Sequence, residues 1–321
     1  PLTHAVSLTD AEFKTASWDW VQDTAAATTT WGAIGDWDVS AVKDMSHAFS
    51  NHRNAAGSGG VVGGNDKAAL FDGLGLSEWK TGALVDLDST FRGASLMNSD
   101  FDGWDVSQVT SLYQTFYGAA AMNGNLGTWN VEQVADMRKT FTSASVFTGS
   151  SLRTWITSNI RNLFATFNGA TAMNANLGNW QVAKVTGLQN AFENAAAFEG
   201  NGLETWVTTS MTTLQNAFHG AAVMNANLGG WITSNTQNVR ETFYEAVKFT
   251  GVGIEKWNVA KVTNMDNTFF GATSLATCNK RKIADAWSPI STVFVATTYD
   301  TEWAGDTCPV RCVCVCVCVC V

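Results

Sequence analysis

The chain has 321 residues and a formal net charge of -9, and only 15% of its residues are charged. Its lysines and arginines are scattered rather than gathered into a basic patch, which argues against nucleic-acid binding. Because it contains no run of 18 apolar residues, we expect no segment that spans a membrane.

Residues 1–33 are predicted to form an N-terminal cap. Thr9 and Glu12 have the spacing of a capping box, and Phe13, Ala16 and Trp20 follow at helical intervals. We therefore expect an amphipathic helix over about residues 10–27 that covers the first repeat, since a stack of repeats must cover its open ends. Because the chain begins at Pro1 rather than Met, we expect that preceding residues are missing or have been removed.

A repeat of 25 or 26 residues occupies residues 34–277, and a tryptophan marks each unit. A phenylalanine follows each of these tryptophans after 12 residues. A period of this length is typical of a solenoid, in which each unit buries its apolar face against its neighbours. Positions are numbered from the tryptophan, so that Trp+1 is the residue after it. The nine tryptophans are Trp37, Trp79, Trp104, Trp129, Trp155, Trp180, Trp206, Trp231 and Trp257.

Each unit is predicted to contain a short strand and a helical return. Leu126, Trp129 and Val131 have the spacing of a leucine-rich repeat, so we expect a strand at about residues 128–132 and at equivalent positions. Apolar residues over 109–119 are then spaced 3, 4 and 3 apart, which favours an inward helical or 3-10 face. The sequence therefore predicts an α/β solenoid, leucine-rich-repeat-like, of nine coils with one parallel β-sheet and short helical or 3-10 returns.

The apolar setting of the tryptophans predicts that they form the core. Burial of each ring would contribute roughly 2–3 kcal/mol, and each indole N–H then needs an acceptor, such as a backbone carbonyl of a neighbouring coil. The 25-residue steps follow Met-Asn turns, and the 26-residue steps follow Phe-x-Gly turns. We interpret the asparagines as groups that close their turns or reach the next coil, rather than as a ladder for a ligand. They are Asn98, Asn123, Asn174 and Asn225.

An insertion of about 16 residues follows Phe49, over about residues 50–67. Its glycines predict a flexible surface loop. It lacks the Lys-Ser/Thr pair of a phosphate-binding loop and the spacing of a dinucleotide fingerprint. We therefore interpret it as a tolerated surface loop, with a binding loop as the alternative.

Residues 278–310 depart from the repeat and are predicted to form a C-terminal cap. Cys278 and Cys308 are the only cysteines before the tail, so they predict a disulfide and hence an oxidising compartment; two unpaired thiols are the alternative. Residues 311–321 are a low-complexity Cys-Val tail. An extended row of thiolates does not converge on a metal ion, so we assign the tail no metal-binding role.

The sequence carries no recognisable catalytic or metal-binding motif. Its four histidines lie in different units, and no nucleophile elbow, zinc-protease or EF-hand pattern occurs. Asp38 and Asp105 could act as an acid and a base, but they are two coils apart, roughly 10 Å by strand spacing, with Lys80 between them. We therefore predict a non-enzymatic protein without cofactor or metal.

The Trp+1 residues are predicted to face outward. The first four are polar or charged, including Asp38, Asp105 and Asn130, whereas Ile156, Val207 and Ile232 are apolar. An exposed apolar stripe would mark a partner site. A threonine follows each of the three, however, so a strand slipped by one residue could instead turn the apolar side chains inward. The sequence leaves both interpretations open.

The repeat resembles a known family of surface-protein repeats. The segment GDWDVSAVKDMS at residues 35–46 and the segment WNVAKVTNMDNTFFGA at residues 257–272 resemble the BspA-type repeat. It is similar to a domain of unknown function in mycoplasma lipoproteins. The resemblance covers about residues 34–277 and implies a leucine-rich-repeat-like fold on a surface or secreted protein, with no catalytic residues. The Trp-Ile-Thr and Trp-Val-Thr units and the Gly-rich insertion depart from the usual motif.

Together these features predict a monomeric surface or secreted protein that binds a protein or glycan partner through its sheet face. Ile156, Val207 and Ile232 would supply apolar contacts, and the polar contacts would come from Asp38, Asp105 and Asn130. A purely structural spacer with no specific ligand is the alternative.

Overall fold

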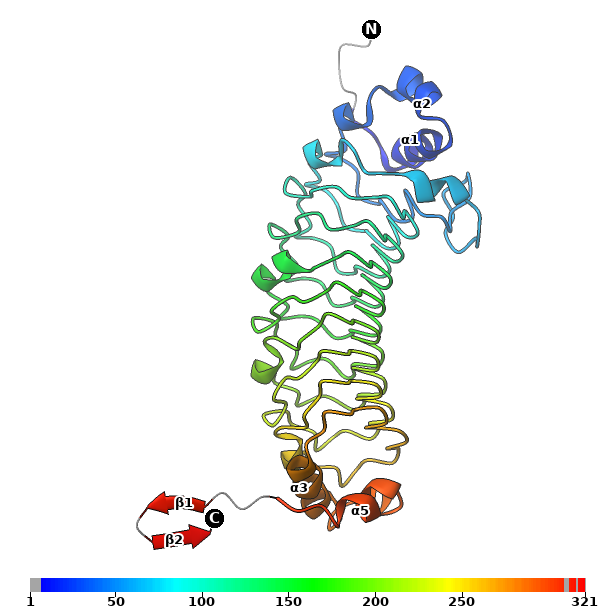
Figure 1. Cartoon of the computed structure of the whole chain (residues 1–321). Coiled ribbons are helices and arrows are strands. Elements are labelled where there is room, and N and C mark those ends of the chain that lie inside the picture. The colour runs from blue at the N-terminus through cyan, green and yellow to red at the C-terminus, as the bar shows by residue number, and fades with distance from the viewer. Residues whose placement is uncertain (1–6, 309–311, 316, 321) are drawn as a thin grey trace.

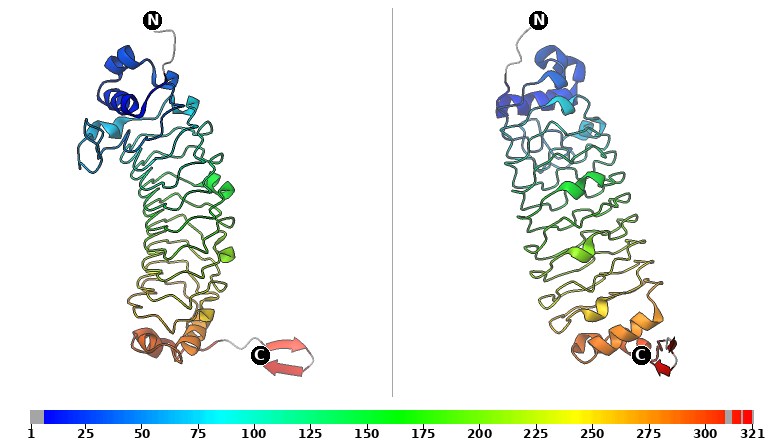
Figure 2. Two further views of the ribbon diagram at one scale, coloured as in Figure 1. Left: turned by 180° about the vertical axis from the view of Figure 1, so that it is seen from behind. Right: turned by 90° about the vertical axis from the view of Figure 1, so that its left-hand side faces the viewer.

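The computed structural model describes residues 7–308, 312–315 and 317–320. It is an elongated stack of backbone coils with helices at both ends (Figure 1), and the views from behind and from the side show the same stack (Figure 2). Residues 1–6 of the predicted cap and part of the Cys-Val tail lie outside the described residues. None of the helices in the described ranges is long and apolar enough to cross a bilayer.

Helices lie at the ends of the stack and at its edge. The N-terminal end carries α1 (Asp10–Gln22) and α2 (Thr24–Trp31), and the C-terminal end carries α3 (Thr277–Trp287), α4 (Thr292–Val295) and α5 (Thr298–Trp303). The 3-10 helices are η1 (Ile34–Asp36), η2 (Asp66–Leu70), η3 (Leu76–Glu78), η4 (Ser150–Thr154), η5 (Leu203–Thr205) and η6 (Ile254–Lys256). In the tail, β1 (Cys312–Val315) pairs antiparallel with β2 (Val317–Cys320).

The predicted α/β solenoid with a parallel sheet is wrong. Within residues 7–308 the structure has no β-strand, and the strand expected at residues 128–132 is absent. Neighbouring coils share isolated parallel bridges at Trp+7, as between Asp136 and Asn162. The 3-10 helices of the repeats also lie elsewhere than predicted, just before the tryptophan.

A close succession of turns explains why no strand forms. The N–H of Val109 donates to the C=O of Val106 at 2.9 Å, and the N–H of Thr115 donates to the C=O of Leu112 at 3.2 Å. The residue at Trp+10 has a positive φ of 53–58° in all nine coils, which takes the chain out of the extended region. Apolar residues three apart therefore face inward from turns, without the helical return predicted over residues 109–119.

The core consists of two columns of stacked aromatic rings. The phenylalanines at Trp+12 are buried, and successive rings lie nearly parallel with centroids 5.5–5.8 Å apart. The nine tryptophans are buried too, which confirms the prediction that they form the core. The indole N–H of Trp180 donates to the C=O of Leu152 in the preceding coil at 3.1 Å, and six other tryptophans make the same contact. The indole N–H of buried Trp129 has no such partner.

Both caps continue the aromatic core. The capping box of Thr9 and Glu12 is present at the start of α1, and Phe13 of that helix packs edge-on against Trp37. The single helix expected over about residues 10–27 is two helices, because Asp23 ends α1 and caps α2. At the other end, Trp287 of α3 stacks on the last repeat tryptophan with centroids 6.3 Å apart.

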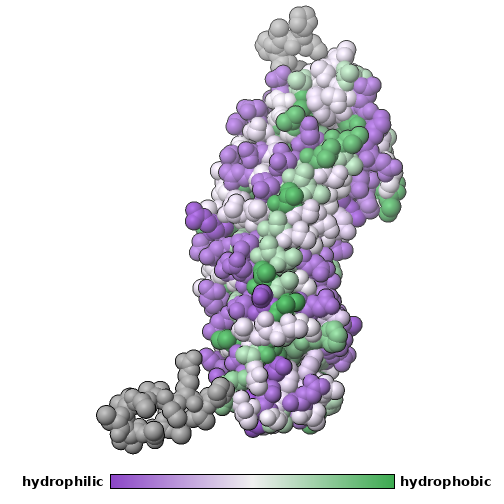
Figure 3. Space-filling view, viewed as in Figure 1, coloured by the Kyte–Doolittle hydropathy of each residue, from purple (hydrophilic) through white to green (hydrophobic). Residues whose placement is uncertain are grey.

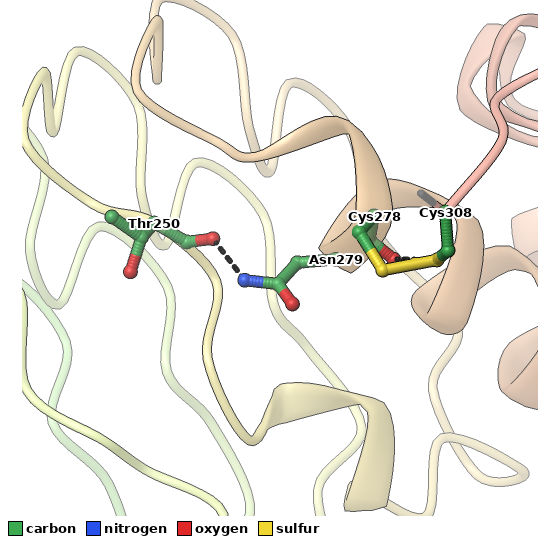
Figure 4. Close-up of a disulfide and its surroundings, with 4 residues drawn as sticks. All are labelled: Thr250, Cys278, Asn279 and Cys308. Atoms are coloured by element: carbon green, nitrogen blue, oxygen red, sulfur yellow. Dashed lines mark hydrogen bonds between the residues drawn. A yellow bond between two sulfur atoms is a disulfide. The ribbon is translucent and has the colours of Figure 1, made fainter. Parts of the chain in front are cut away.

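The C-terminal cap is tied to the stack at two points. The Sγ atoms of Cys278, in α3, and Cys308, after α5, are bonded to each other (Figure 4). The Asn279 amide donates to the C=O of Thr250, in the turn that precedes the last coil, at 2.8 Å. The disulfide therefore joins the end of the cap, after α5, to α3, and the Asn279 hydrogen bond joins α3 to the stack.

The Gly-rich insertion folds back against α1. The guanidinium of Arg53 is buried and donates to Ser17 Oγ at 2.9 Å and to a backbone carbonyl of α1. Burial lowers the pKa of Arg53 to about 10. Gly59 rests on His47, since a Cβ there would lie 2.0 Å from the imidazole Nε2. The insertion is thus anchored at its base, which its glycine content alone does not indicate.

Candidate functional site

The Trp+1 side chains form one outward-facing column along the stack. Ile156, Val207 and Ile232 are 56%, 53% and 44% exposed, and the threonine that follows each is at most 4% exposed. The slipped register, which would turn the aliphatic side chains inward, is therefore wrong. The exposed apolar stripe is the arrangement that the fold adopts.

The threonines at Trp+2 have a different role, which is to join neighbouring coils. Thr208 Oγ1 accepts a hydrogen bond from the N–H of Ile232 at 2.7 Å and donates to the C=O of the same residue at 3.1 Å. Thr81 makes the same pair of contacts with Asp105, at 2.8 and 3.1 Å. Buried hydroxyls need hydrogen-bond partners. The hydroxyls of these threonines find them in the backbone of the next coil, and so join neighbouring coils where no strand ladder is present. The Thr208 hydroxyl fixes the backbone of Ile232 with the side chain outward.

A shallow depression of about 510 Å³ lies on this face between Ile156 and Val207. The intervening coil contributes Gln181, whose side chain lies along the surface. Its amide nitrogen donates to the C=O of Asn179 at 2.7 Å, and its Oε1 accepts from the N–H of Thr157 at 3.2 Å. The two aliphatic side chains therefore stand on either side of a polar floor.

The three polar residues predicted to make contacts lie in the same column but serve their own turns. Asp38, Asp105 and Asn130 each accept a hydrogen bond from the backbone N–H two residues later, at 2.9–3.1 Å. Hydrogen bonds from Ser40 hold the pKa of Asp38 below its usual value. These residues lie in earlier coils than the aliphatic three, so the structure does not gather the six into one cluster. No group of three or more His, Cys, Asp or Glu side chains in the described ranges is placed to hold a metal ion.

The asparagines of the Met-Asn turns bridge neighbouring coils. Asn98 Oδ1 accepts from the N–H of Asn123 at 2.9 Å, and Asn123 Oδ1 accepts from the N–H of Thr148 at 3.0 Å. Asn225 Oδ1 accepts in the same way from the N–H of Thr250 at 2.9 Å. The interpretation of these residues as structural bridges is confirmed.

Sequence reasoning missed a second exposed apolar feature, at Trp+16 and Trp+17. Its larger members are exposed, and alanines fill most of the intervening positions. Figure 3 shows this face, with a green and pale stripe along the stack. The signal in the sequence is the recurrence of small or apolar residues at the two positions before the buried Met or Phe at Trp+18. We call it the alanine stripe; its larger members are Leu96, Val146, Val223 and Val247.

A comparison with known families places these features in context. The family model described as "Mycoplasma protein of unknown function, DUF285" matches residues 19–57, 65–180 and 161–283. The interval between the first two matches falls within the Gly-rich insertion. No curated protein matches the chain.

Proposed function

We propose that this chain, which belongs to the DUF285 family of mycoplasma proteins of unknown function, is a non-enzymatic surface or secreted protein that binds a protein or glycan partner. The binding surface would be the face formed by the Trp+1 side chains. The resemblance of its repeat to BspA-type surface repeats supports a location outside the cell. The Cys278–Cys308 bond supports it further, since disulfides persist in oxidising compartments.

The observation that carries the proposal is the exposure of Ile156, Val207 and Ile232 in one column, the first two on either side of a depression. Exposed apolar side chains grouped on a polar surface often mark a partner site. Fully burying such a side chain contributes roughly 1.5–3 kcal/mol, so three half-exposed residues could supply a substantial part of a binding energy. The backbone beneath them is held by inter-coil hydrogen bonds, so the surface is in place before a partner arrives.

The test is saturable binding to a variant in which the three residues become asparagine. Asparagine stands naturally at this position in Asn130 and Asn258, so the variant should fold. The matched control changes Val146, Val223 and Val247 of the alanine stripe to asparagine, since these are also exposed. Surface extracts and a glycan panel serve as probes. Loss of capture only in the Ile156, Val207 and Ile232 variant supports the proposal, and equal capture by both variants contradicts it.

A structural spacer is the second candidate function. It is favoured by Asp38, Asp105 and Asn130, whose side chains are each occupied within their own turns. A folded wild-type protein that shows no saturable binding to any of the probes would support this candidate over the first.

A further inference from the structure

Acidic residues are absent from one face of the last five coils. This face comprises positions Trp−1 to Trp+8 of these coils, and we call it the acid-free face. Its residues are 154–163, 179–188, 205–214, 230–239 and 256–265. They include four exposed cationic residues, Arg161, Lys184, Lys256 and Lys261. The same positions in the first four coils hold eight acidic residues, Asp36, Asp38, Asp44, Glu78, Asp86, Asp105, Glu132 and Asp136.

The composition of these coils does not explain the absence. The chain as a whole has 28 acidic residues and a net charge of -9. The last five coils do carry acidic residues, but at positions outside Trp−1 to Trp+8. These are Glu193, Glu199, Glu204, Glu241, Glu245, Glu255 and Asp266. The acidic residues of these coils thus lie outside the face that displays Ile156, Val207 and Ile232, and Glu204 and Glu255 border it at Trp−2.

Two lysines of this face are held by neutral amides rather than by carboxylates. Lys184 Nζ donates to Asn159 Oδ1 at 2.9 Å, and Lys261 Nζ donates to Asn235 Oδ1 at 2.9 Å. Each asparagine is the Trp+4 residue of the preceding coil and donates in turn to a backbone carbonyl of the coil before it. The ammonium groups are therefore positioned without being neutralised. None of the four cations of the acid-free face is in an ion pair within the described part of the chain.

We propose that the acid-free face binds an extended acidic polypeptide. Aliphatic side chains of the ligand would pack against Ile156, Val207 and Ile232, and its carboxylates would pair with the cations beside them. Lys184 lies on the coil between Ile156 and Val207, so a charge contact adjoins the depression. This inference rests on the proposed function and specifies the chemistry of the partner.

Complementary charge and the choice of apolar residues favour a polypeptide over a polysaccharide. Carboxylates on the ligand would explain why this face has no Asp or Glu, since like charges across an interface are costly. Branched aliphatic residues offer apolar contact to aliphatic side chains, which a uronic-acid polymer lacks. Four coil steps separate Arg161 from Lys261, or roughly 20 Å at strand spacing. An extended chain advances roughly 3.3 Å per residue, so the ligand must be at least about six residues long.

The probe is a fluorescein-labelled 12-residue peptide of alternating Glu and Val, and binding is followed by fluorescence anisotropy. Replacing Lys184 and Lys261 by glutamine should weaken binding about three- to tenfold, as expected for two solvent-exposed charge contacts, and should flatten its salt dependence. The matched control replaces Lys139 and Lys248, which lie outside the acid-free face, and should bind as the wild type does. Changing Asn159 and Asn235 to alanine should weaken binding less, because the lysines keep their charge but lose their support.

Three outcomes would overturn the inference. They are an absence of saturable binding, equal binding of an alternating Lys-Val peptide, and binding of alginate that the Glu-Val peptide does not displace. If capture of a partner depends on Ile156, Val207 and Ile232 while the Glu-Val peptide fails to bind, the proposed function stands and this inference fails. If neither binding depends on this face, both fail.

Discussion

Replacement of Thr208 by valine tests how the coils are joined beneath the candidate site. The side chain is 1% exposed, and its hydroxyl makes two hydrogen bonds with the backbone of Ile232, at 2.7 and 3.1 Å. Valine has nearly the same shape but lacks both contacts. In the slipped register this hydroxyl would face solvent and Val207 would face inward. The substitution therefore also distinguishes that register from the one in the structure.

The expected loss of stability follows from these contacts. Each net hydrogen bond is worth about 1 kcal/mol, and the orphaned N–H of Ile232 adds a desolvation cost, so we expect a loss of about 2–3 kcal/mol. For a chain of this size, that corresponds to a fall in Tm of about 3–5 °C. Thr208→Ser keeps the hydroxyl and should recover much of the loss.

The assay combines denaturation with amide exchange. Guanidinium denaturation followed by tryptophan fluorescence reports the stability of the stack, and hydrogen exchange reports the N–H of Ile232, which should exchange faster in the valine variant. Thr209→Val is the matched control, because Thr209 is exposed and next in the chain; it should lie within about 0.5 kcal/mol of the wild type. Equal stability of the Thr208 and Thr209 variants would refute the inter-coil role of this hydroxyl.

Three further predictions concern the caps and the insertion. Arg53→Met should destabilise the protein by about 3 kcal/mol, because it removes the buried hydrogen bonds to Ser17 Oγ and to the carbonyls of Lys14 and Ala48. An unchanged urea midpoint would show that the insertion is not anchored by this residue. Loss of the Cys278–Cys308 bond, whose cysteines are 30 residues apart, should cost about 3–4 kcal/mol, seen as faster proteolysis near α5 in the double serine variant. Burial lowers the pKa of His47, so the unfolded chain binds a proton more readily and stability should fall as pH drops below about 6.5. His47→Gln should flatten the decline of the denaturation midpoint between pH 7.5 and 5, leaving the part due to His52, whose pKa burial also lowers. Equal declines in the variant and the wild type would contradict this.

Much of the core could be predicted from the sequence because burial follows the repeat. Trp180 and its counterparts recur at one position with apolar neighbours, so their burial and their need for a carbonyl acceptor follow from composition and spacing. The capping box of Thr9 and the bridging role of Asn98 depend on hydrogen bonds that these side chains commonly make at turns. These features are periodic or local, so a single chain read along its length contains them.

The backbone conformation and the exposed faces were decided only by the tertiary structure. The spacing of Leu126, Trp129 and Val131 suits a strand, but turns also direct residues two and three apart into the core. The choice depends on backbone partners about 25 residues away, which no local pattern specifies. For the same reason the sequence left open a slipped register at Thr208, whose hydroxyl forms a bridge to Ile232 in the structure. The acid-free face likewise exists only once five coils are stacked, because its residues are separated along the chain and meet only in space.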